Sequence, residues 1–368
     1  MKKISLIIVY TLLICNIVLS NMVISPVFAS YDNDFEESIL ELESGREKGF
    51  NVFNENGDFL FAQEDVNIGD QLIDKSYNVY EITVVDNELN VAYAKLISKI
   101  NMPKVKKYSA SNISNEKIDK KIGLYMTHND ESYVIGDGTE SVYGNGGIYD
   151  IAKQLQSELT NLDINTTLDS TLHIPHNSTA YSRSEKTAKN LLSKNVDALF
   201  DIHRDGVSRS AYVTKFNGSE KCKVRIVIGK ANPNKEQNLK LALYLMAVAN
   251  ETYPWLFADI YYAKGHYNQG LSNKMLLFEM GTYLVEKDLV EKSVPALADV
   301  INTTLYHTVI DEEGNISINA KETSSQTTIN NALKDSEDSS SSLVIALFVT
   351  IAVIVIFGSV ALIKLKAK

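Results

Sequence analysis

The sequence predicts an α/β protein: a mostly parallel sheet flanked by helices, preceded by a small β domain and followed by a C-terminal transmembrane helix. Short apolar runs alternate with helical patterns between residues 121 and 310, which is typical of parallel strands joined through helices. Between residues 30 and 100 the chain carries β-rich runs separated by turn signals, and from Leu343 to Ile363 it has no charged residue. These three patterns place most of the folded chain in the segment 121–310.

The composition is that of a globular protein. The 368 residues are 45% hydrophobic, which is enough for one sizeable domain and a smaller one. The formal net charge is −10 and Lys and Arg form no interior cluster, so we expect no nucleic-acid binding. Of the two cysteines, Cys15 lies in the leading apolar segment and Cys222 in the interior. A chain that has lost the leading segment holds one thiol, which excludes an internal disulfide and a cysteine-based metal site.

Residues 1–29 predict a secretory signal peptide or, if it is not cleaved, an N-terminal anchor. Two lysines follow Met1 and precede an apolar run from Ile4 to Leu19, and Val27-Phe28-Ala29 resembles a small-residue cleavage site. The body of the chain is therefore expected to leave the cytoplasm.

The other end of the chain predicts a membrane anchor. Residues 311–342 are rich in Ser, Thr, Asn, Asp and Glu, as in a disordered stalk. The uncharged run Leu343–Ile363 is long enough to cross a hydrocarbon core of about 30 Å, and the lysines of the tail 364–368 favour the cytoplasmic side. The alternative for this run is a buried core helix. We expect a protein of the cell membrane whose residues before Leu343 lie on the extracytoplasmic side.

Residues 30–100 predict a small β-rich domain that begins with a polar helix over Tyr31–Lys48. The run FNVFNENGDFLFAQ places two β-rich segments around Asn56-Gly57, a strong hairpin signal, and YNVYEITVVDNELNVAYAKL repeats the pattern. No reactive constellation occurs here, so we expect a role in spacing or docking. Residues 101–120 are polar and predict a linker.

The larger domain, residues 121–310, shows four strand-like runs: KIGLYMTH, NVDALFDIH, CKVRIVIG and KMLLFEMG. Apolar residues recur at helical spacing in four other segments. These segments are GGIYDIAKQLQSELTNL, SEKTAKNLLSK with Ser184 as a candidate cap, NKEQNLKLALYLMAVANETY, and the stretch from Glu286 to Leu305.

Three of the apolar runs end in a residue that can bind a metal or accept a proton, namely His128, His203 and Glu279. In an open parallel sheet the ligand crevice lies beyond the carboxyl ends of the strands, so we expect these side chains at one edge. Each also has a simpler interpretation. A histidine at a strand end is often a hydrogen-bonded structural residue, and Glu279 could pair with Arg204 or a lysine. The coincidence of three strand ends favours a functional site.

His128, Glu131 and His203 form a set of two histidines and one carboxylate. Catalytic zinc typically takes three such ligands and leaves a fourth position for a water, which then loses its proton near neutral pH. A carboxylate outside the ligand set must take that proton and pass it to the leaving group. Glu279 suits this role because its apolar neighbours would raise its pKa by desolvation. The residues leave open whether Glu131 or Glu140 completes the metal site, and Glu131 could instead accept backbone hydrogen bonds.

Polar residues beside His203 are candidates for supporting roles. Asp201 and Asp205 could orient the ligand imidazoles, and Arg204 could hold a substrate carboxylate with its forked donors.

Three further candidates lie elsewhere in the chain. His173 could line the cleft, whereas His176 is weaker because the intervening proline argues against a helix that would align the two. Tyr267 and Asn268 belong to the run KGHYNQGLS, which is rich in glycine and polar groups, as a substrate-binding loop would be.

Four motifs, in this order, resemble the stage II sporulation protein P family: THNDESY (Thr127–Tyr133), DIHRDG (Asp201–Gly206), YNQGLS (Tyr267–Ser272) and LLFEMG (Leu276–Gly281). The resemblance extends over Ile122–Ile301, and its specificity lies in the combination of the motifs. It implies an amidase-like fold and a zinc N-acetylmuramoyl-L-alanine amidase that also cleaves peptide cross-links of peptidoglycan.

The resemblance also assigns roles. His128 and His203 fall on the essential histidines of the family, and Glu131 and Glu279 on its motif glutamates. The implied partners are stage II sporulation proteins D and M, and the implied setting is engulfment of the forespore in endospore-forming bacteria. An alternative is a non-catalytic cell-wall-binding module on the same fold, and a third interpretation is a dedicated carboxypeptidase or endopeptidase.

The chain departs from the usual family pattern at three points. Met126 stands where the family often has histidine, and Gly270 where it often has aspartate. Family members are usually anchored near the N-terminus, whereas a membrane helix is predicted here over Leu343–Ile363.

Overall fold

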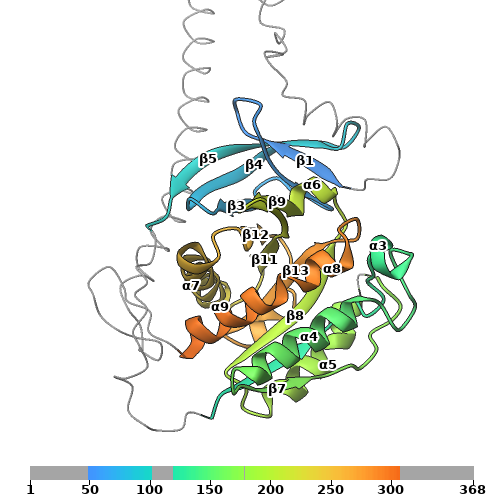
Figure 1. Ribbon diagram of the computed structural model, residues 1–368. Helices are drawn as coiled ribbons and strands as arrows, with labels where there is room; N and C mark the ends of the chain where they lie inside the picture. The colour runs from blue at the N-terminus through green and yellow to red at the C-terminus, as the bar shows by residue number, and fades with distance from the viewer. Residues whose placement is uncertain (1–48, 102–118, 178, 307–368) are drawn as a thin grey trace, which may run out of the picture. The chain divides into compact units, whose positions relative to one another are not determined.

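The computed structural model describes residues 49–101, 119–177 and 179–306. Eleven strands form one sheet in the order β2-β1-β5-β4-β3-β12-β11-β13-β8-β6-β7, and β10-β9 form a separate hairpin (Figure 1). The strand bounds are β1 Phe50–Phe53, β2 Phe59–Gln63, β3 Gln71–Asp74, β4 Asn78–Asp86, β5 Val91–Lys99, β6 Lys121–Tyr125, β7 Asn165–Leu168, β8 Ala198–Asp205, β9 Val213–Phe216, β10 Ser219–Cys222, β11 Val224–Gly229, β12 Phe257–Ala263 and β13 Met275–Thr282.

Several predicted segments lie outside the described residues. They are the signal segment 1–29, the polar helix Tyr31–Lys48, most of the linker, the stalk 311–342, the transmembrane run Leu343–Ile363 and the tail 364–368. Among the residues that the structure describes, no helix has the length and hydropathy needed to span a bilayer.

The part of the sheet from β12 to β7 confirms the predicted α/β architecture. Four of its five strand pairings are parallel, and only β11 and β13 run antiparallel. The four predicted strand runs form β6, β8, β11 and β13. Two strands of this part of the sheet were not predicted from the sequence: β7, a short edge strand with the polar sequence NTTL, and β12.

Helices cover both faces of this part of the sheet (Figure 1). Their bounds are α3 Val134–Asp137, α4 Ile148–Asn161, α5 Ala180–Leu192, α6 Arg209–Tyr212, α7 Lys235–Thr252, α8 Lys287–Glu291, α9 Val294–Tyr306 and the 3₁₀ turn η2 Gln269–Leu271. Apolar residues of α4, α7 and α9 share one core with the sheet, whereas α5 contributes Ala188 and Leu191 to a core that includes Leu199 and Met275.

Two predicted helix boundaries were wrong. The segment from Glu286 to Leu305 forms two helices, α8 and α9, because Pro295 fits the first turn of α9 but would break the hydrogen bonding of one continuous helix. Helix α5 begins at Ala180, so Ser184 lies inside it rather than at its cap. The Ser184 hydroxyl is buried and hydrogen-bonds the Thr127 hydroxyl at 2.8 Å.

The β-rich region is joined to the rest of the sheet. β3 pairs antiparallel with β12, so that Ile73 lies opposite Ile260. Phe61, Leu72 and Ile82 of this region share a hydrophobic core with residues of β11, β12 and β13. Turn and alternation signals act over a few residues and report that hairpins form, but they carry no information about which distant strand edge they join.

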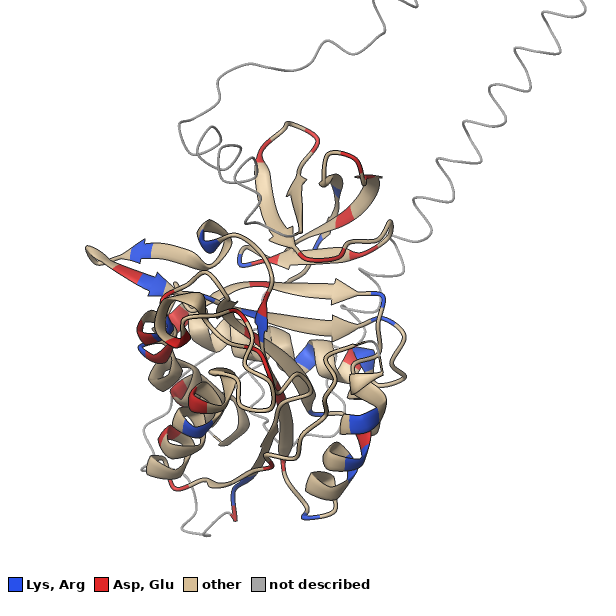
Figure 2. Cartoon of the chain, turned by 90° about the vertical axis from the view of Figure 1, so that its right-hand side faces the viewer, with Lys and Arg blue, Asp and Glu red and all other residues tan. Residues whose placement is uncertain are grey.

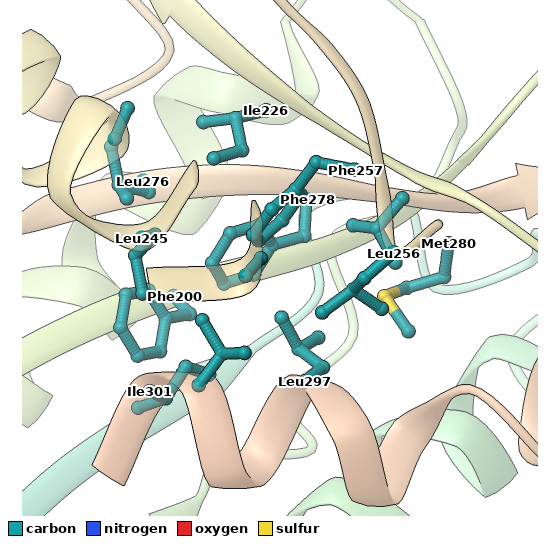
Figure 3. Packing of buried hydrophobic residues seen from close by; sticks show 14 of the residues in the cluster. Phe200, Ile226, Leu245, Leu256, Phe257, Leu276, Phe278, Met280, Leu297 and Ile301 are labelled. Atoms are coloured by element: carbon teal, nitrogen blue, oxygen red, sulfur yellow. The ribbon is translucent and has the colours of Figure 1, made fainter. Parts of the chain in front are cut away.

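The two-residue period of the central strands separates a core face from an open face. Phe200 of β8, Phe278 of β13 and Ile226 of β11 belong to one core, in which Leu297 and Ile301 of α9 lie on the side of Phe200 and Phe278 (Figure 3). The residues that alternate with Phe200 and Phe278 on their strands point the other way, and these include His203 of β8 and Glu279 of β13.

Charged residues of both signs are interspersed over several helices and strands (Figure 2). Some form local pairs: Arg209 of α6 contacts Glu220 and Glu286, and Lys287 contacts Asp137 and Asp150. These pairs link α3, α4, α6 and α8 at the edge of the helical layer.

Candidate metal centre and active site

Strand β8 presents His203 to the open face because its neighbours Phe200 and Ile202 are buried on the other side. Glu279 of β13 lies directly opposite His203 in the parallel pairing of the two strands. Two of the three predicted strand-end residues are therefore neighbours in one sheet register.

His128 and Glu131 come from the turn that follows β6 and join His203. Glu131 Oε1 lies 3.1 Å from His128 Nδ1 and 3.4 Å from His203 Nδ1. The His128 and His203 rings are 4.8 Å apart between centroids. Glu131 Oε2 accepts a hydrogen bond from the backbone N–H of Arg204 at 2.9 Å, which fixes the carboxylate. The three predicted metal ligands therefore meet in space, although Glu131 and His203 are far apart in sequence.

A third imidazole, His176, lies at the same place. Its ring stacks on that of His128 with centroids 3.8 Å apart, and its Nδ1 lies 2.9 Å from Asp130 Oδ1. Ligand atoms of His128, Glu131 and His176 all lie within 4.8 Å of one another. His176 was a weak candidate from the sequence because Pro175 argues against a helix that would align it with His173, but the loop after β7 brings it to the cluster without a helix.

The charged state of the cluster follows from its burial and its pairing. Burial alone would raise the pKa of Glu131, but the charge of His203 and the hydrogen bond with His128 hold that pKa well below its usual range. Burial lowers the pKa of His128, which favours the neutral imidazole that binds metals. The cluster thus offers an ionised carboxylate and a neutral imidazole.

Glu279 has the opposite character. Burial raises the pKa of its carboxyl group well above the usual range, and the nearby charge of Asp205 raises it further. Within the described residues, its buried Oε2 has no hydrogen-bond partner. A carboxyl group of this kind can hold a proton at neutral pH and release it to a reacting group.

The donor set fits a zinc ion. Imidazole nitrogens and one carboxylate oxygen are typical ligands of catalytic zinc. His203 Nε2 is buried and forms no hydrogen bond of acceptable geometry among the described residues, although Asp201 Oδ1 lies 3.0 Å away. Asp201 in turn accepts hydrogen bonds from the Thr127 hydroxyl at 2.6 Å and the Thr127 backbone N–H at 2.8 Å. Asp201 therefore lies where a carboxylate that orients a ligand imidazole is expected.

The other predicted supporting residues have different contacts. Asp205 accepts hydrogen bonds from Tyr212 and from the buried Arg225 rather than from an imidazole. The Arg204 guanidinium donates to the backbone carbonyls of Ser132 and Glu140. Arg204 therefore ties the turn after β6 to β8.

His173 does not reach the cavity. It is buried, and its ring nitrogens contact the Met126 carbonyl at 2.8 Å and the Thr187 hydroxyl at 2.9 Å. The prediction that His173 lines the cleft is wrong, because both ring nitrogens already have partners inside the protein.

A cavity of about 790 Å³ lies against the cluster. Tyr267 lines it, and burial raises the pKa of its hydroxyl to about 12. Asn268 is not a lining residue; its amide donates to the Tyr181 carbonyl at 2.9 Å and the Ser184 hydroxyl at 3.1 Å. Glu140 lines the cavity, but it is Glu131 whose carboxylate lies 3.1 Å from His128 Nδ1 and 3.4 Å from His203 Nδ1, so the geometry favours Glu131 as the carboxylate ligand.

Sequence reasoning missed two groups of cavity residues. Tyr181 of α5 lies parallel to the His203 ring, with centroids 6.2 Å apart, and no motif pointed to it. The segment Gln63–Asp70, which is the last residue of β2 and the loop before β3, lines the same cavity through Gln63, Glu64, Asp65, Asn67 and Asp70. These residues carry no signal because their place depends on the pairing of β3 with β12.

Fold and site together define an α/β protein with a histidine–carboxylate candidate metal centre on the open face of its sheet. The chain belongs to the stage II sporulation protein P family, whose model matches residues 52–302. The Stage II sporulation protein P of Bacillus subtilis (strain 168) is 26% identical to it over 204 residues, which are 50% of this chain and 51% of that protein. The match therefore spans about half the length of this curated relative.

Solved amidase structures overlap with part of the chain. The CwlD amidase of Clostridioides difficile, in complex with the GerS lipoprotein, is 17% identical over 50% of this chain and 94% of that chain, with a TM-score of 0.34. The N-acetylmuramyl-L-alanine amidase Ami1 of Mycobacterium smegmatis is 15% identical over 52% of this chain and 95% of that chain, with a TM-score of 0.35. Both TM-scores are low, so neither likeness supports a statement about activity.

Proposed function

We propose that the chain is a zinc-dependent peptidoglycan hydrolase of the N-acetylmuramoyl-L-alanine amidase type, with endopeptidase activity as well. One observation carries the proposal: His128, Glu131 and His203 converge beside the buried Glu279 carboxyl group at an open cavity. Membership of the stage II sporulation protein P family supports the choice of the cell wall as substrate.

In amide hydrolysis, three residues of the chain would bind the metal and a fourth would transfer the proton. Zinc held by His128, Glu131 and His203 would supply a water of lowered pKa and polarise the scissile carbonyl. Glu279 takes one proton from the attacking water as the new C–O bond forms. It then gives that proton to the nitrogen as the C–N bond breaks, so that one water yields one acid and one amine.

The high pKa of Glu279 suits the second half of this transfer, whereas the first half needs the ionised carboxylate, which the positive charge of a zinc ion nearby would favour. Burial and the charge of Asp205 favour its protonated form, which is the form that donates to the leaving nitrogen. The lactyl amide and the peptide cross-link are both amides, so one centre can cleave either bond when the cavity admits it. This is the basis for proposing two activities at a single site.

We also propose a cellular setting that follows from the ends of the sequence and from the family. The catalytic domain would lie on the extracytoplasmic side of the cell membrane, anchored by Leu343–Ile363, and would act in forespore engulfment with stage II sporulation proteins D and M. Protease added outside wall-stripped cells should then remove residues 49–306 and leave the membrane segment. Protection of these residues would contradict this topology.

Digestion of purified sacculi by the full-length chain in detergent, with zinc present, tests the activity. We expect stem peptides with a new L-alanine amino terminus, identified by mass spectrometry, and peptides cut at the cross-links. The Glu279→Gln variant should release neither. Sacculus binding without any released product would instead support a non-catalytic wall-binding module, and cleavage of peptide bonds alone would support a dedicated peptidase.

A further inference from the structure

The loop Gln63–Asp70, between β2 and β3, lies in the wall of the cavity that contains His128 and Glu279. The loop is held firmly. Asp70 accepts a hydrogen bond from the Tyr261 hydroxyl at 2.9 Å, and Arg225 donates to the Gln63 side chain at 2.7 Å. The β-rich region therefore contributes a fixed wall to the site rather than only spacing or docking.

The side chain of Glu64 lies close to the end of β8. A Cβ atom at Gly206 would lie 2.7 Å from Glu64 Oε2, so the glycine that closes the motif DIHRDG leaves room for this carboxylate. No hydrogen bond or ion pair of the Glu64 carboxylate is found within residues 49–101, 119–177 and 179–306. A carboxylate placed in a substrate cavity without a protein partner is available to a substrate cation.

The net negative charge of the cavity also favours a cationic substrate group. Its lining residues include seven Asp or Glu residues and two Lys or Arg residues: Glu64, Asp65, Asp70, Glu131, Glu140, Asp205 and Glu279 against Arg204 and Lys264. With Glu279 protonated and Asp205 paired with Arg225, the five remaining carboxylates still exceed the two cations by three charges, which is more than one zinc ion would neutralise. The unpartnered, buried Oε2 of Glu279 faces the same cavity. A cavity of this sign favours cationic over anionic substrate groups.

We propose that Glu64 determines substrate specificity by pairing with a primary ammonium group on the peptide of the substrate. The inference rests on the proposed function, because wall stem peptides carry a diamino acid whose free amine is such a group. Burial raises the pKa of Glu64 and Asp205 raises it further, while the charges of Arg204 and His176 offset part of this rise. Neither cation forms an ion pair with Glu64, so the carboxylate lacks a directly paired counter-charge among the described residues. An ammonium group bound there supplies it.

Calorimetry with two soluble ligands tests the proposal. The ligands are an N-acetylmuramoyl tripeptide that ends in L-lysine and the same compound with an acetylated lysine side chain. They are titrated into the full-length, zinc-loaded Glu279→Gln chain, which does not turn them over. We expect the free amine to bind about 10-fold more tightly, as for a hydrogen bond to a charged group. Adding Glu64→Gln should remove this difference by weakening only the free-amine ligand.

Two further variants complete the design. Gly206→Ala displaces the Glu64 carboxylate and should also reduce the preference for the free amine. Glu55→Gln removes an exposed carboxylate of the β-rich region that contacts Lys95 outside the cavity, and should leave the preference unchanged. Equal binding of the two ligands, a preference that survives Glu64→Gln, or no binding of either ligand would overturn the inference. Hydrolysis of the same compounds by the wild-type chain tests the proposed function separately.

Discussion

Within β8, alternate residues serve the core and the site. Phe200 and Ile202 belong to the core that also contains Leu297 and Ile301 of α9, while Asp201 and His203 face the cavity side. A shift of one residue in register would bury the imidazole and expose the phenylalanine. Burial of the apolar residues therefore fixes the position of His203.

The separate role of Glu279 predicts a variant that keeps its metal and loses its activity. Glu279→Gln keeps the shape of the side chain but cannot accept and return a proton, so we expect a loss of about 10²–10⁴-fold in kcat with zinc content unchanged. Sacculus digestion and metal analysis measure the two quantities. Glu185→Gln, an exposed carboxylate of α5, is the control. Activity within a few-fold of wild type would exclude Glu279 as the proton carrier.

His203 and His176 are alternative candidates for the second imidazole ligand, and the zinc affinity of variants at each position distinguishes them. His203 is buried between Glu131 and Asp201, whereas His176 is half exposed and its Nδ1 already contacts Asp130. We expect His203→Ala to abolish tight zinc binding and His176→Ala to weaken it by about 10–100-fold at most, as for an outer partner. Competition with a zinc chelator measures both. The reverse order would assign His176 as the ligand.

Among the substitutions considered, we expect replacement of Arg225 to lower the free energy of unfolding the most. It is 1% exposed, forms a bidentate pair with Asp259 and also contacts Asp205 at 3.0 Å. Removing it leaves two buried carboxylates unpaired, so Arg225→Ala should lower the free energy of unfolding by about 3–5 kcal/mol. Urea denaturation provides the measurement.

The matched control for Arg225 is Arg209, whose ion pairs with Glu220 and Glu286 lie at the surface. We expect Arg209→Ala to cost no more than about 1 kcal/mol. Equal effects of the two substitutions would show that the buried network does not contribute as its contacts indicate.

At the scale of elements, the β-rich region completes both the sheet and the cavity. A chain that begins at Lys120 would leave the edge of β12 unpaired and expose Tyr261 and Leu277, which share a core with this region. We therefore expect a fragment 120–312 to aggregate or to unfold at a lower temperature than a fragment 49–312, and to lose most of its activity. Light scattering, thermal unfolding and sacculus digestion measure these properties. Equal stability and activity would contradict a structural role for β1–β5.

The elements that could be predicted are those whose signal is local. The runs that form β6, β8, β11 and β13 are apolar, and those of β6, β8 and β13 lead into candidate site residues, so strands and site could be inferred together. The short polar strand β7 has no such signal. The joining of β3 to β12 could not be predicted either, because strand propensity does not specify a partner.

In the molecule as a whole, the difference between local signals and long-range strand pairing determines which site residues could be predicted from the sequence. His128, Glu131, His203 and Glu279 were predicted from strand ends and motifs, and they meet in the structure. His176, Tyr181 and the loop Gln63–Asp70 reach the cavity through loops and a strand pairing that no short-range pattern encodes. The strand ends could therefore be inferred from sequence, whereas the walls of the cavity required the fold.

Anomalous scattering at the zinc edge, from crystals of the zinc-loaded protein, tests the central claim most directly. The predicted result is a single peak with His128, Glu131 and His203 as ligands at about 2.0–2.2 Å, with the Glu279 carboxyl group outside the ligand set. The absence of a peak between these side chains, or a peak held by other residues, would contradict it.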